Sequence, residues 1–357
     1  MQKNNQSVVD VIRNTLISTM KKNKNIILFG EGIDDAAAMY GTTKGLRKIF
    51  GEKRVFEMPL SENCIIATAI GASIMGDTVI VNFQRVEFAL LALEQIINNA
   101  AKLSYLTNGQ KKVRIVIRLV VGRGWGQGPT HSQSLESLFC LIPGLKVYMP
   151  VFPNETKDLL YQAIHDPNPS IFIENRWCHY NYGKINKKFI KKNTNFIKLN
   201  SGKDLTIIST GYSSAEILRL VKFLKNKKIN IDFYHLRILK PLDISFILKS
   251  IKKNKKLILV DNGYKNFGIM SELIKRIVEK NINFIKAPVI MGIDDVLIPS
   301  SKVYLDKTYV NIDKILFQIL KMLNLKKRNI KFSKEIKILL KKNNLNDVPN
   351  AAFKGPF

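Results

Sequence analysis

The sequence predicts an α/β protein of two doubly wound domains, each built on a mainly parallel sheet. Short runs rich in Val, Ile and Leu alternate with segments whose apolar residues fall at helical spacing. The alternation stops between Trp177 and Asp204, where the sequence turns basic and polar, and then resumes. The 357 residues are enough for two or three domains of ordinary size. Strands that alternate with helices indicate parallel sheets covered on both faces.

The first domain is expected to span residues 1–180. Its first helix is predicted from Val8, Val9, Ile12 and Leu16, which share one helical face. The other expected helices cover 88–106, 134–141 and 155–165, together with a small-residue helix after position 62. The expected strands cover 25–30, 78–81, 114–118, 146–149 and 170–174.

The second half repeats this alternation after a basic linker at 181–204 and forms an expected domain at 205–325. A lysine-rich amphipathic helix and a proline-containing tail are expected in residues 326–357. The predicted strands of the second domain cover 205–209, 231–236, 256–261 and an edge strand at 283–290. Its predicted helices cover 215–225, 246–252 and 269–279.

The chain is strongly basic, with a formal net charge of +29. Such a charge would ordinarily prompt a search for nucleic acid. Here the lysines are spread through Asn- and Ile-rich segments such as 184–192 and 222–228, with no pattern of interleaved aromatic residues. We therefore interpret them as solvated faces and expect no nucleic-acid partner.

The spacing of the cysteines and the hydropathy of the sequence indicate where in the cell the protein is expected. The three cysteines, Cys64, Cys140 and Cys178, lie far apart and form no paired metal or redox motif. The first ten residues lack an apolar core of signal-peptide length, and no stretch reaches the ~18 apolar residues of a membrane span. We expect a cytoplasmic protein without a membrane partner.

Two motifs carry groups suited to acid/base chemistry. The first, at 59–62, reads Pro-Leu-Ser-Glu and places Glu62 at the head of a small-residue helix. The second, at 130–133, reads Thr-His-Ser-Gln and places His131 after the glycine-rich loop 122–129. Alone, Ser61 and Glu62 would be a helix cap, and His131 a structural histidine behind a surface turn.

Six further segments decide between these interpretations by their order along the chain: residues 26–31, 43–46, 50–55, 94–102, 142–147 and 166–169. With the two motifs they resemble the beta subunit of the thiamine-diphosphate-dependent decarboxylase component of 2-oxo acid dehydrogenases (pyruvate, branched-chain or acetoin type). The resemblance covers roughly residues 7 to 325. It implies a transketolase-like pyrimidine-binding domain followed by a transketolase C-terminal domain.

The resemblance also implies roles for residues of the first domain. Glu62 matches the glutamate that protonates the pyrimidine ring of thiamine diphosphate, a task that needs a carboxyl group tuned by burial. Glu31 matches a residue that supports this glutamate, and Gln84 one that shapes the same pocket. Phe88 matches the aromatic residue packed on the pyrimidine, although core packing also explains it.

His131 matches the family histidine near the reacting carbon, and imidazole suits proton transfer near neutral pH. Four other residues match positions that hold a structural potassium ion in the family. The alternative for this group is an ordinary Asp-Pro-Asn turn. The four are Ile115, Ala163, Asp166 and Asn168.

The family's magnesium motif, Gly-Asp-Gly, does not occur in the sequence, and Gly76-Asp77-Thr78 lacks the second glycine. The resemblance therefore implies an alpha subunit that carries magnesium and anchors the diphosphate, in an alpha2-beta2 heterotetramer. A lipoyl acyltransferase is a further implied partner.

Departures from the family pattern leave the substrate open. Residues 174–179 replace the usual Glu-X-X-X-Tyr-Gly, and Arg123, Trp125 and Gln127 replace small residues of the glycine loop. Such a loop suits a polar substrate, so the alternative is half of a two-subunit transketolase-like or carboligase enzyme. A non-catalytic basic scaffold is a third hypothesis, and the presence of Glu62 argues against it.

Overall fold

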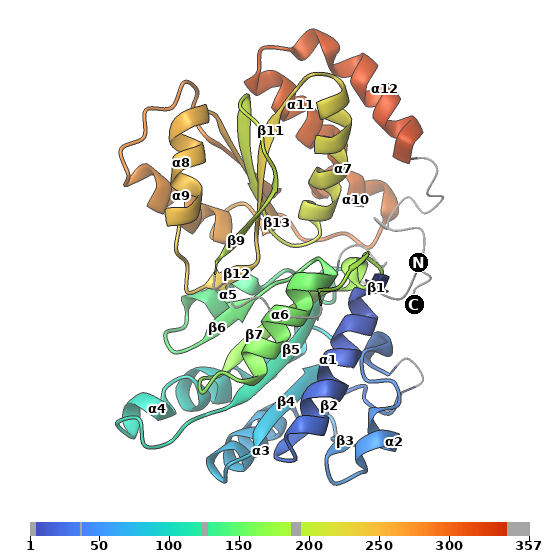
Figure 1. Ribbon diagram of the computed structural model, residues 1–357, viewed down its shortest axis with the longest axis vertical. Coiled ribbons are helices and arrows are strands. Elements are labelled where there is room, and N and C mark those ends of the chain that lie inside the picture. Colours follow the sequence, from blue (N-terminus) through green and yellow to red (C-terminus); the bar gives the residue numbers. More distant parts are fainter. Residues whose placement is uncertain (1–4, 36–37, 123–127, 187–193, 341–357) are drawn as a thin grey trace. The chain divides into compact units, whose positions relative to one another are not determined.

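The computed structural model describes residues 5–35, 38–122, 128–186 and 194–340 (Figure 1). The chain divides into two compact units. The first contains the described residues up to Gly122 and those from Leu138 to Asn186, and the second contains 128–137 and 194–340. The segment that carries His131 thus groups with the second unit, although it lies within the first domain expected from the sequence.

The first unit is built on a parallel sheet in the order β6-β7-β5-β4-β2-β3. All residues of β4, β5 and β7 are buried, which explains their uninterrupted apolar sequences. The strands expected from the sequence are present, and the short β3 was not expected. The bounds are β2 Ile26–Gly30, β3 Val55–Glu57, β4 Thr78–Phe83, β5 Ile115–Val121, β6 Lys146–Tyr148 and β7 Ser170–Asn175.

Helices pack around this sheet (Figure 1). Helix α1 packs against α6, and α3 packs against β4 and the segments that follow it. Ser7 caps α1, since its Oγ accepts from the backbone N–H of Asp10 at 3.1 Å. Two short antiparallel strands, β1 Asn5–Ser7 and β8 Tyr182–Lys184, pair with each other. The helices are α1 Val8–Lys22, α2 Leu46–Phe50, α3 Glu62–Ile74, α4 Leu103–Leu106, α5 Glu136–Leu141 and α6 Pro153–Ile164.

The prediction of one long helix over 88–106 is wrong. The segment consists of a 3-10 turn at Phe88–Ala92, a π-helical turn at Gln95–Ala100 and the short α4. Its buried residues Ala89, Ala92, Ile96 and Ala100 are spaced three, four and four residues apart, as on one face of an ordinary helix. The spacing that predicts one helix therefore also fits this succession of tighter and wider turns.

The second unit contains a sheet in the order β14-β13-β10-β11-β9, in which only β9 is antiparallel among the described pairs. β9 lies in the segment expected to be a linker. The predicted edge strand at 283–290 starts later, because Pro288 cannot donate a backbone hydrogen bond. The bounds are β9 Phe196–Asn200, β10 Leu205–Ser209, β11 Ile231–Leu236, β12 Ile238–Lys240, β13 Leu257–Tyr264 and β14 Val289–Ile293.

The lysine-rich helix expected near the C-terminus is α12, and it packs into the core of the second unit. Phe332 meets Phe223 edge-on at 5.8 Å, and Glu335 pairs with Lys227 at 2.5 Å. Among the described helices none is long and apolar enough to cross a bilayer. The helices of this unit are α7 Ser213–Asn226, α8 Ser245–Asn254, α9 Ile269–Val278, α10 Lys302–Thr308, α11 Ile312–Met322 and α12 Asn329–Leu340.

Candidate active site

Glu31 is a buried carboxyl group at the carboxyl end of β2. The preceding Gly30 has φ +136°, and a Cβ there would lie 2.2 Å from the carbonyl oxygen of Asn82, so only glycine fits. The Glu31 side chain is 2% exposed, and its two oxygens have no hydrogen-bond partner in the described chain. Burial raises the pKa of Glu31 to about 7, with further contributions from the charges of Glu62 and Glu57.

Glu57, at the end of β3, lies beside Glu31 and belongs to none of the motifs in the sequence. Its carboxylate accepts hydrogen bonds from three successive backbone N–H groups, those of Gly32 (2.8 Å), Ile33 (2.6 Å) and Asp34 (3.0 Å). These three hydrogen bonds fix the turn after Glu31. The signal in the sequence was weak, because Glu57 ends an unexpected three-residue strand.

Glu62 is the first residue of α3 and is half-buried. Ser61, at the N-cap, makes no side-chain hydrogen bond to the helix, so its part in the simple capping interpretation is not supported. Glu62 is close enough to raise the pKa of Glu31. The half-buried Glu62 and the buried Glu31 thus place two interacting carboxyl groups in different surroundings.

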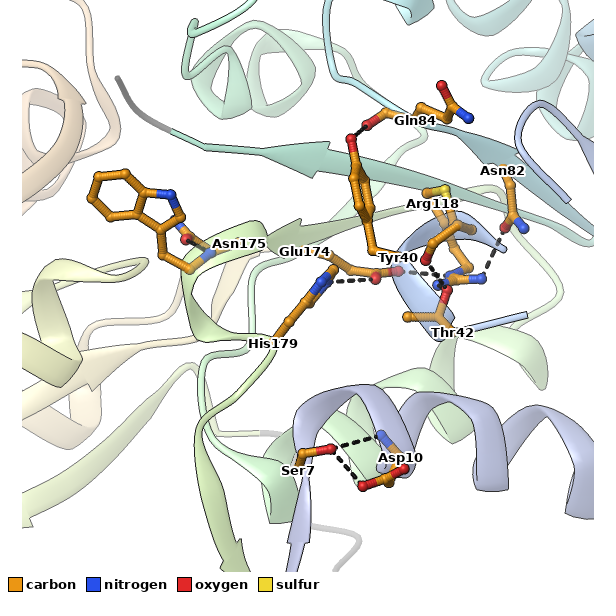
Figure 2. Close-up of polar contacts among 12 residues, drawn as sticks. Ser7, Asp10, Tyr40, Thr42, Asn82, Gln84, Arg118, Glu174, Asn175 and His179 are labelled. Carbon is orange, nitrogen blue, oxygen red and sulfur yellow. Dashed lines mark hydrogen bonds and ion pairs between the residues drawn. The ribbon is translucent and has the colours of Figure 1, made fainter. Parts of the chain in front are cut away.

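Gln84 and Phe88 follow β4 on the same edge of the sheet. The side-chain amide of Gln84 donates to Asp35 Oδ2 at 2.7 Å. The backbone carbonyl oxygen of Gln84 accepts from the Tyr40 hydroxyl at 3.5 Å (Figure 2). Gln84 also fills the space beside Gly32, where a Cβ would lie 2.1 Å from its Nε2. Phe88 is half-buried and opens the 3-10 turn.

A fully buried ion-pair network lies behind this edge (Figure 2). Arg118, in β5, donates through Nε to Glu174 at 2.6 Å, through Nη1 to Asn82 at 3.0 Å and through Nη2 to Thr42 at 2.8 Å. The second Glu174 oxygen lies 3.2 Å from Nε2 of His179. Arg118 thereby connects β4, β5 and β7 to the turn before α2 through hydrogen bonds.

The turn held by Arg118 is strained. Ala38, Met39 and Tyr40 have φ values of 46°, 47° and 57°, in the left-handed region that side chains rarely adopt. Arg176 lies over the Tyr40 ring, 4.5 Å from its centroid. Consecutive strained residues persist where surrounding contacts hold them, and the Thr42–Arg118 contact is one of these.

The residues that depart from the family pattern at 174–179 are built into the interior. Trp177 and Cys178 are each 1% exposed and His179 is 0% exposed. Asn175 accepts from the backbone N–H of Trp177 at 3.1 Å, as Figure 2 shows. These side chains therefore lie in the protein interior and are not exposed to solvent. The other departure, at Arg123, Trp125 and Gln127, lies outside the described residues.

His131 belongs to the second unit and is half-buried. Its segment begins at Gly128, where φ is +68° and a Cβ would lie 2.5 Å from Ser300 Oγ. The neighbouring Ser132 accepts through its carbonyl oxygen from the Tyr309 hydroxyl at 3.5 Å. The residues predicted to touch the cofactor thus fall in two groups, with Glu31, Glu62, Gln84 and Phe88 in the first unit.

Of the residues matched to a potassium site, Asp166 and Asn168 form a turn before β7, whereas Ile115 begins β5 and Ala163 lies in α6. Asp166 Oδ1 accepts from the backbone and amide nitrogens of Asn168 at 3.0 and 3.2 Å, and Oδ2 is paired with Lys146. These contacts are those of the Asp-Pro-Asn turn, and they engage the carboxylate. A potassium ion would therefore depend on carbonyl oxygens such as those of Ile115 and Ala163. Among the described residues no cluster of His, Cys, Asp or Glu forms a metal site.

Two domain families match the chain. Residues 4–178 match the transketolase pyrimidine-binding domain, and residues 196–315 match the transketolase C-terminal domain. Pyruvate dehydrogenase E1 component subunit beta of Gracilaria tenuistipitata var. liui is 34% identical over 79% of this chain and 87% of its own. The chain belongs to the pyruvate dehydrogenase E1 beta-subunit family. The family and fold predictions are therefore confirmed.

Other E1 beta relatives give the same picture. The Acholeplasma laidlawii subunit is 32% identical over 83% of this chain and 91% of its own. The Rhizobium meliloti subunit is 31% identical over 80% of this chain, and the match spans 62% of that longer protein. A solved structure described as a split-gene transketolase, inactive beta4 tetramer, is similar in fold, with a TM-score of 0.72, 19% identity and 90% of this chain covered.

Proposed function

We propose that the chain is the catalytic beta half of a thiamine-diphosphate-dependent 2-oxo acid decarboxylase and dehydrogenase. The observation that carries this proposal is the pair Glu31 and Glu62, with Glu31 buried and both of its oxygens without a hydrogen-bond partner in the described chain. An unsatisfied buried carboxyl group is costly unless a ligand completes it. An aminopyrimidine fits that requirement, since its amino group donates a hydrogen bond and its ring nitrogens accept one.

The two carboxyl groups divide the work. Glu62, at the head of α3, donates a proton to the pyrimidine ring nitrogen and takes it back. Glu31 supports Glu62 through the electrostatic interaction between the two carboxyl groups. Gln84 and Phe88 confine the ring between the end of β4 and the turn that follows. When bound, thiamine diphosphate supplies the carbon nucleophile that attacks the 2-oxo group. His131 serves proton transfer around the reacting carbon.

The other half of the enzyme is proposed to come from an alpha subunit. The sequence holds no Gly-Asp-Gly motif, and the described residues hold no acidic or histidine cluster for magnesium. We expect an alpha2-beta2 heterotetramer in the cytoplasm, with acyl transfer to a lipoyl acyltransferase. Potassium at Ile115, Ala163, Asp166 and Asn168 is a secondary proposal.

The second candidate function is half of a two-subunit transketolase-like or carboligase enzyme. The departures at Arg123, Trp125 and Gln127 favour a polar substrate. The two candidates differ in the acceptor that takes the acyl or ketol group. Turnover of pyruvate with a lipoylated domain supports the dehydrogenase, and transfer to an aldehyde with no lipoyl requirement supports the carboligase.

The test of the proposed function is reconstitution with an alpha subunit that carries Gly-Asp-Gly. The chain alone should show no thiamine-dependent turnover and no tight binding of magnesium–thiamine diphosphate. The pair should decarboxylate a 2-oxo acid, and Glu62→Gln should abolish this. Tight cofactor binding by the chain alone would refute the shared site.

A further inference from the structure

A second pair of buried carboxyl groups, Glu136 and Asp261, lies wholly within the second unit. Glu136 is 2% exposed and sits at the start of α5, five residues after His131. Asp261 is 3% exposed and lies in β13. Gly263 packs between them, since a Cβ there would lie 3.4 Å from Glu136 Oε1 and its own N–H donates to Asp261 at 3.1 Å. The proposed catalytic chemistry uses neither carboxyl group.

The two members of this pair have unequal surroundings. Asp261 Oδ1 accepts from the backbone N–H of Gly263, and Oδ2 accepts from that of Met270 at 3.1 Å, in the first turn of α9. Two backbone donors and a helix N-terminus stabilise a negative charge on Asp261. Glu136 Oε2 accepts only from Ser134 Oγ, at 2.7 Å, and Oε1 has no hydrogen-bond partner in the described chain.

Unequal surroundings decide which group is neutral. Burial raises the pKa of Glu136 to about 7, and the charge of Asp261 adds to this. Burial also raises the pKa of Asp261, to about 6, and its backbone donors oppose the rise. Asp261 therefore loses its proton first, and Glu136 keeps its proton to higher pH than Asp261 does.

Other charged groups near the pair have partners of their own. After β13, Lys265 is paired with Asp294, and on α9 Arg276 is paired with Glu272 at 2.7 Å. Tyr309 donates its hydroxyl to Ser132, and Tyr264 donates to the carbonyl oxygen of Val296 at 3.4 Å. The other titratable groups on these elements are His131 and Lys275. Within the described chain no cation is recorded against Glu136.

The pair is joined to the segment that carries His131. Ser134 donates to Glu136 and accepts from the amide of Asn262 at 3.0 Å, which follows Asp261 in β13. On the other side of His131, Ser132 is held by Tyr309. The segment is thus held on both sides of the histidine by contacts within the second unit.

We propose that Glu136 and Asp261 are positioning residues for His131: Glu136, as a neutral acid opposite the ionised Asp261, holds residues 128–136 on the second unit, and loss of its proton weakens that hold. The importance of His131 for turnover rests on the proposed function. The effect of the Glu136 proton on the stability of residues 128–136 is independent of the proposed function.

The test is hydrogen–deuterium exchange of the full chain from about pH 6, the pKa of Asp261, to pH 8.5, with rates corrected for the intrinsic effect of pH. Opening of the segment returns Glu136 toward its ordinary pKa of 4.5. The opening constant of the peptide that contains His131 should therefore rise about tenfold per pH unit up to about pH 7 and then level off. Helix α7, in the same unit, serves as the internal reference and should show no such slope.

The Glu136→Gln variant keeps the shape and removes the titration, so its segment should open equally at every pH. Glu279→Gln, at the exposed end of α9, is the matched control and should keep the wild-type slope. A flat wild-type profile, or a slope that persists in Glu136→Gln, would overturn the proposal. If Glu136→Gln does not fold, the wild-type comparison of the His131 peptide with α7 decides alone. The experiment does not measure turnover, so a result that contradicts this proposal is distinct from one that contradicts the proposed function.

Discussion

Two carboxyl pairs of the described chain, Glu31 with Glu62 and Glu136 with Asp261, differ in which hydrogen-bond donors the protein supplies to their buried members. In the second unit, Asp261 is supplied with backbone donors and Glu136 with the Ser134 hydroxyl. In the first unit, Glu31 is just as buried but both of its oxygens are without a partner in the described chain. The first pair is therefore arranged for a group that the protein itself does not supply, and the second is largely completed from within.

The surroundings of the first pair support this reading. Glu57 takes the three nearby backbone N–H groups, so these donors are not available to Glu31. Arg118, the fully buried cation nearby in the sheet, is committed to Glu174, Asn82 and Thr42. A raised pKa alone thus does not distinguish Glu31 from Glu136, whereas the lack of a hydrogen-bond partner on both oxygens of Glu31 does.

The largest effect expected is on turnover after substitution of Glu62. Glu62→Gln keeps the size of the side chain but cannot transfer a proton, so the turnover of the reconstituted enzyme should fall by about 100- to 10,000-fold. Steady-state kinetics with saturating cofactor measures this. Glu52→Gln, which removes an exposed carboxylate paired with Arg47, is the control and should stay near wild type. A Glu62→Gln enzyme with wild-type turnover would remove Glu62 from the chemistry.

The next largest effect concerns the buried ion pair behind the first site. Glu174→Gln leaves the guanidinium of Arg118 buried without its counter-charge, and loss of one partner of such a pair typically costs about 3–5 kcal/mol. The thermal midpoint of the chain should fall by several degrees. The same measurement on Glu52→Gln gives the background for an exposed pair. An unchanged midpoint in Glu174→Gln would show that Arg118 is not held by this contact.

A smaller effect, opposite in sign, is expected at Glu136. Its pKa of about 7 in the folded chain lies above 4.5, so the folded state keeps a proton that the unfolded chain releases between these pH values. Wild-type stability should therefore fall as pH rises from 5 to 7. Glu136→Gln escapes this loss, so its gain over wild type should be larger at pH 8 than at pH 5, by on the order of 1–3 kcal/mol.

The comparison of the two pairs is sharpened by Glu31→Gln. The pKa of Glu31 is also raised to about 7, so the same sign of pH dependence is expected for its stability. Only Glu31→Gln should also weaken cofactor-dependent turnover, since Glu31 acts beside Glu62. Calorimetry at pH 5 and pH 8, with turnover of both Gln variants, separates the pairs. Equal turnover losses in Glu31→Gln and Glu136→Gln would erase the distinction.

The smallest effect is expected at Ser134. Its hydroxyl donates to Glu136 and lowers the pKa of that group against the effect of burial. Ser134→Ala should therefore move the midpoint of the pH-dependent opening upward, with a stability change of about 1 kcal/mol. Hydrogen exchange of the His131 peptide measures the midpoint. A downward movement would show that this hydroxyl does not stabilise the charged carboxylate.

Much of the fold could be predicted from the sequence, because buried parallel strands leave uninterrupted apolar runs such as those of β4, β5 and β7. The breaks in the segment 88–106 could not, since its buried alanines and Ile96 keep the spacing of a continuous helix and periodicity alone does not distinguish 3-10 and π turns from one. β9 was missed because its five residues are mostly half-buried, include the exposed Lys198 and lie in a basic stretch.

The site was predicted only where a family motif marked it. The motifs named Glu62 and His131, and the resemblance added Glu31, Gln84 and Phe88. Glu57 and Arg118 escaped notice because their roles arise from partners far along the chain: Arg118 meets Thr42, 76 residues away, and Glu174, 56 residues away. Glu136 escaped for the same reason, since Asp261 lies on a distant strand. The hydrogen-bond donors of a buried carboxyl group come from residues distant in the sequence, so a carboxyl group without donors can be recognised only in the folded chain.

The most direct test of the central claim is hydrogen–deuterium exchange at the thiazolium carbon of thiamine diphosphate in the reconstituted heteromer. Glu62 is proposed to act before any substrate bond changes, and His131 after substrate has bound. Exchange should therefore be lost in Glu62→Gln and kept in His131→Ala, while both variants lose turnover. Wild-type exchange in Glu62→Gln would contradict the assignment of the activating carboxyl group and the functional difference between the two carboxyl pairs.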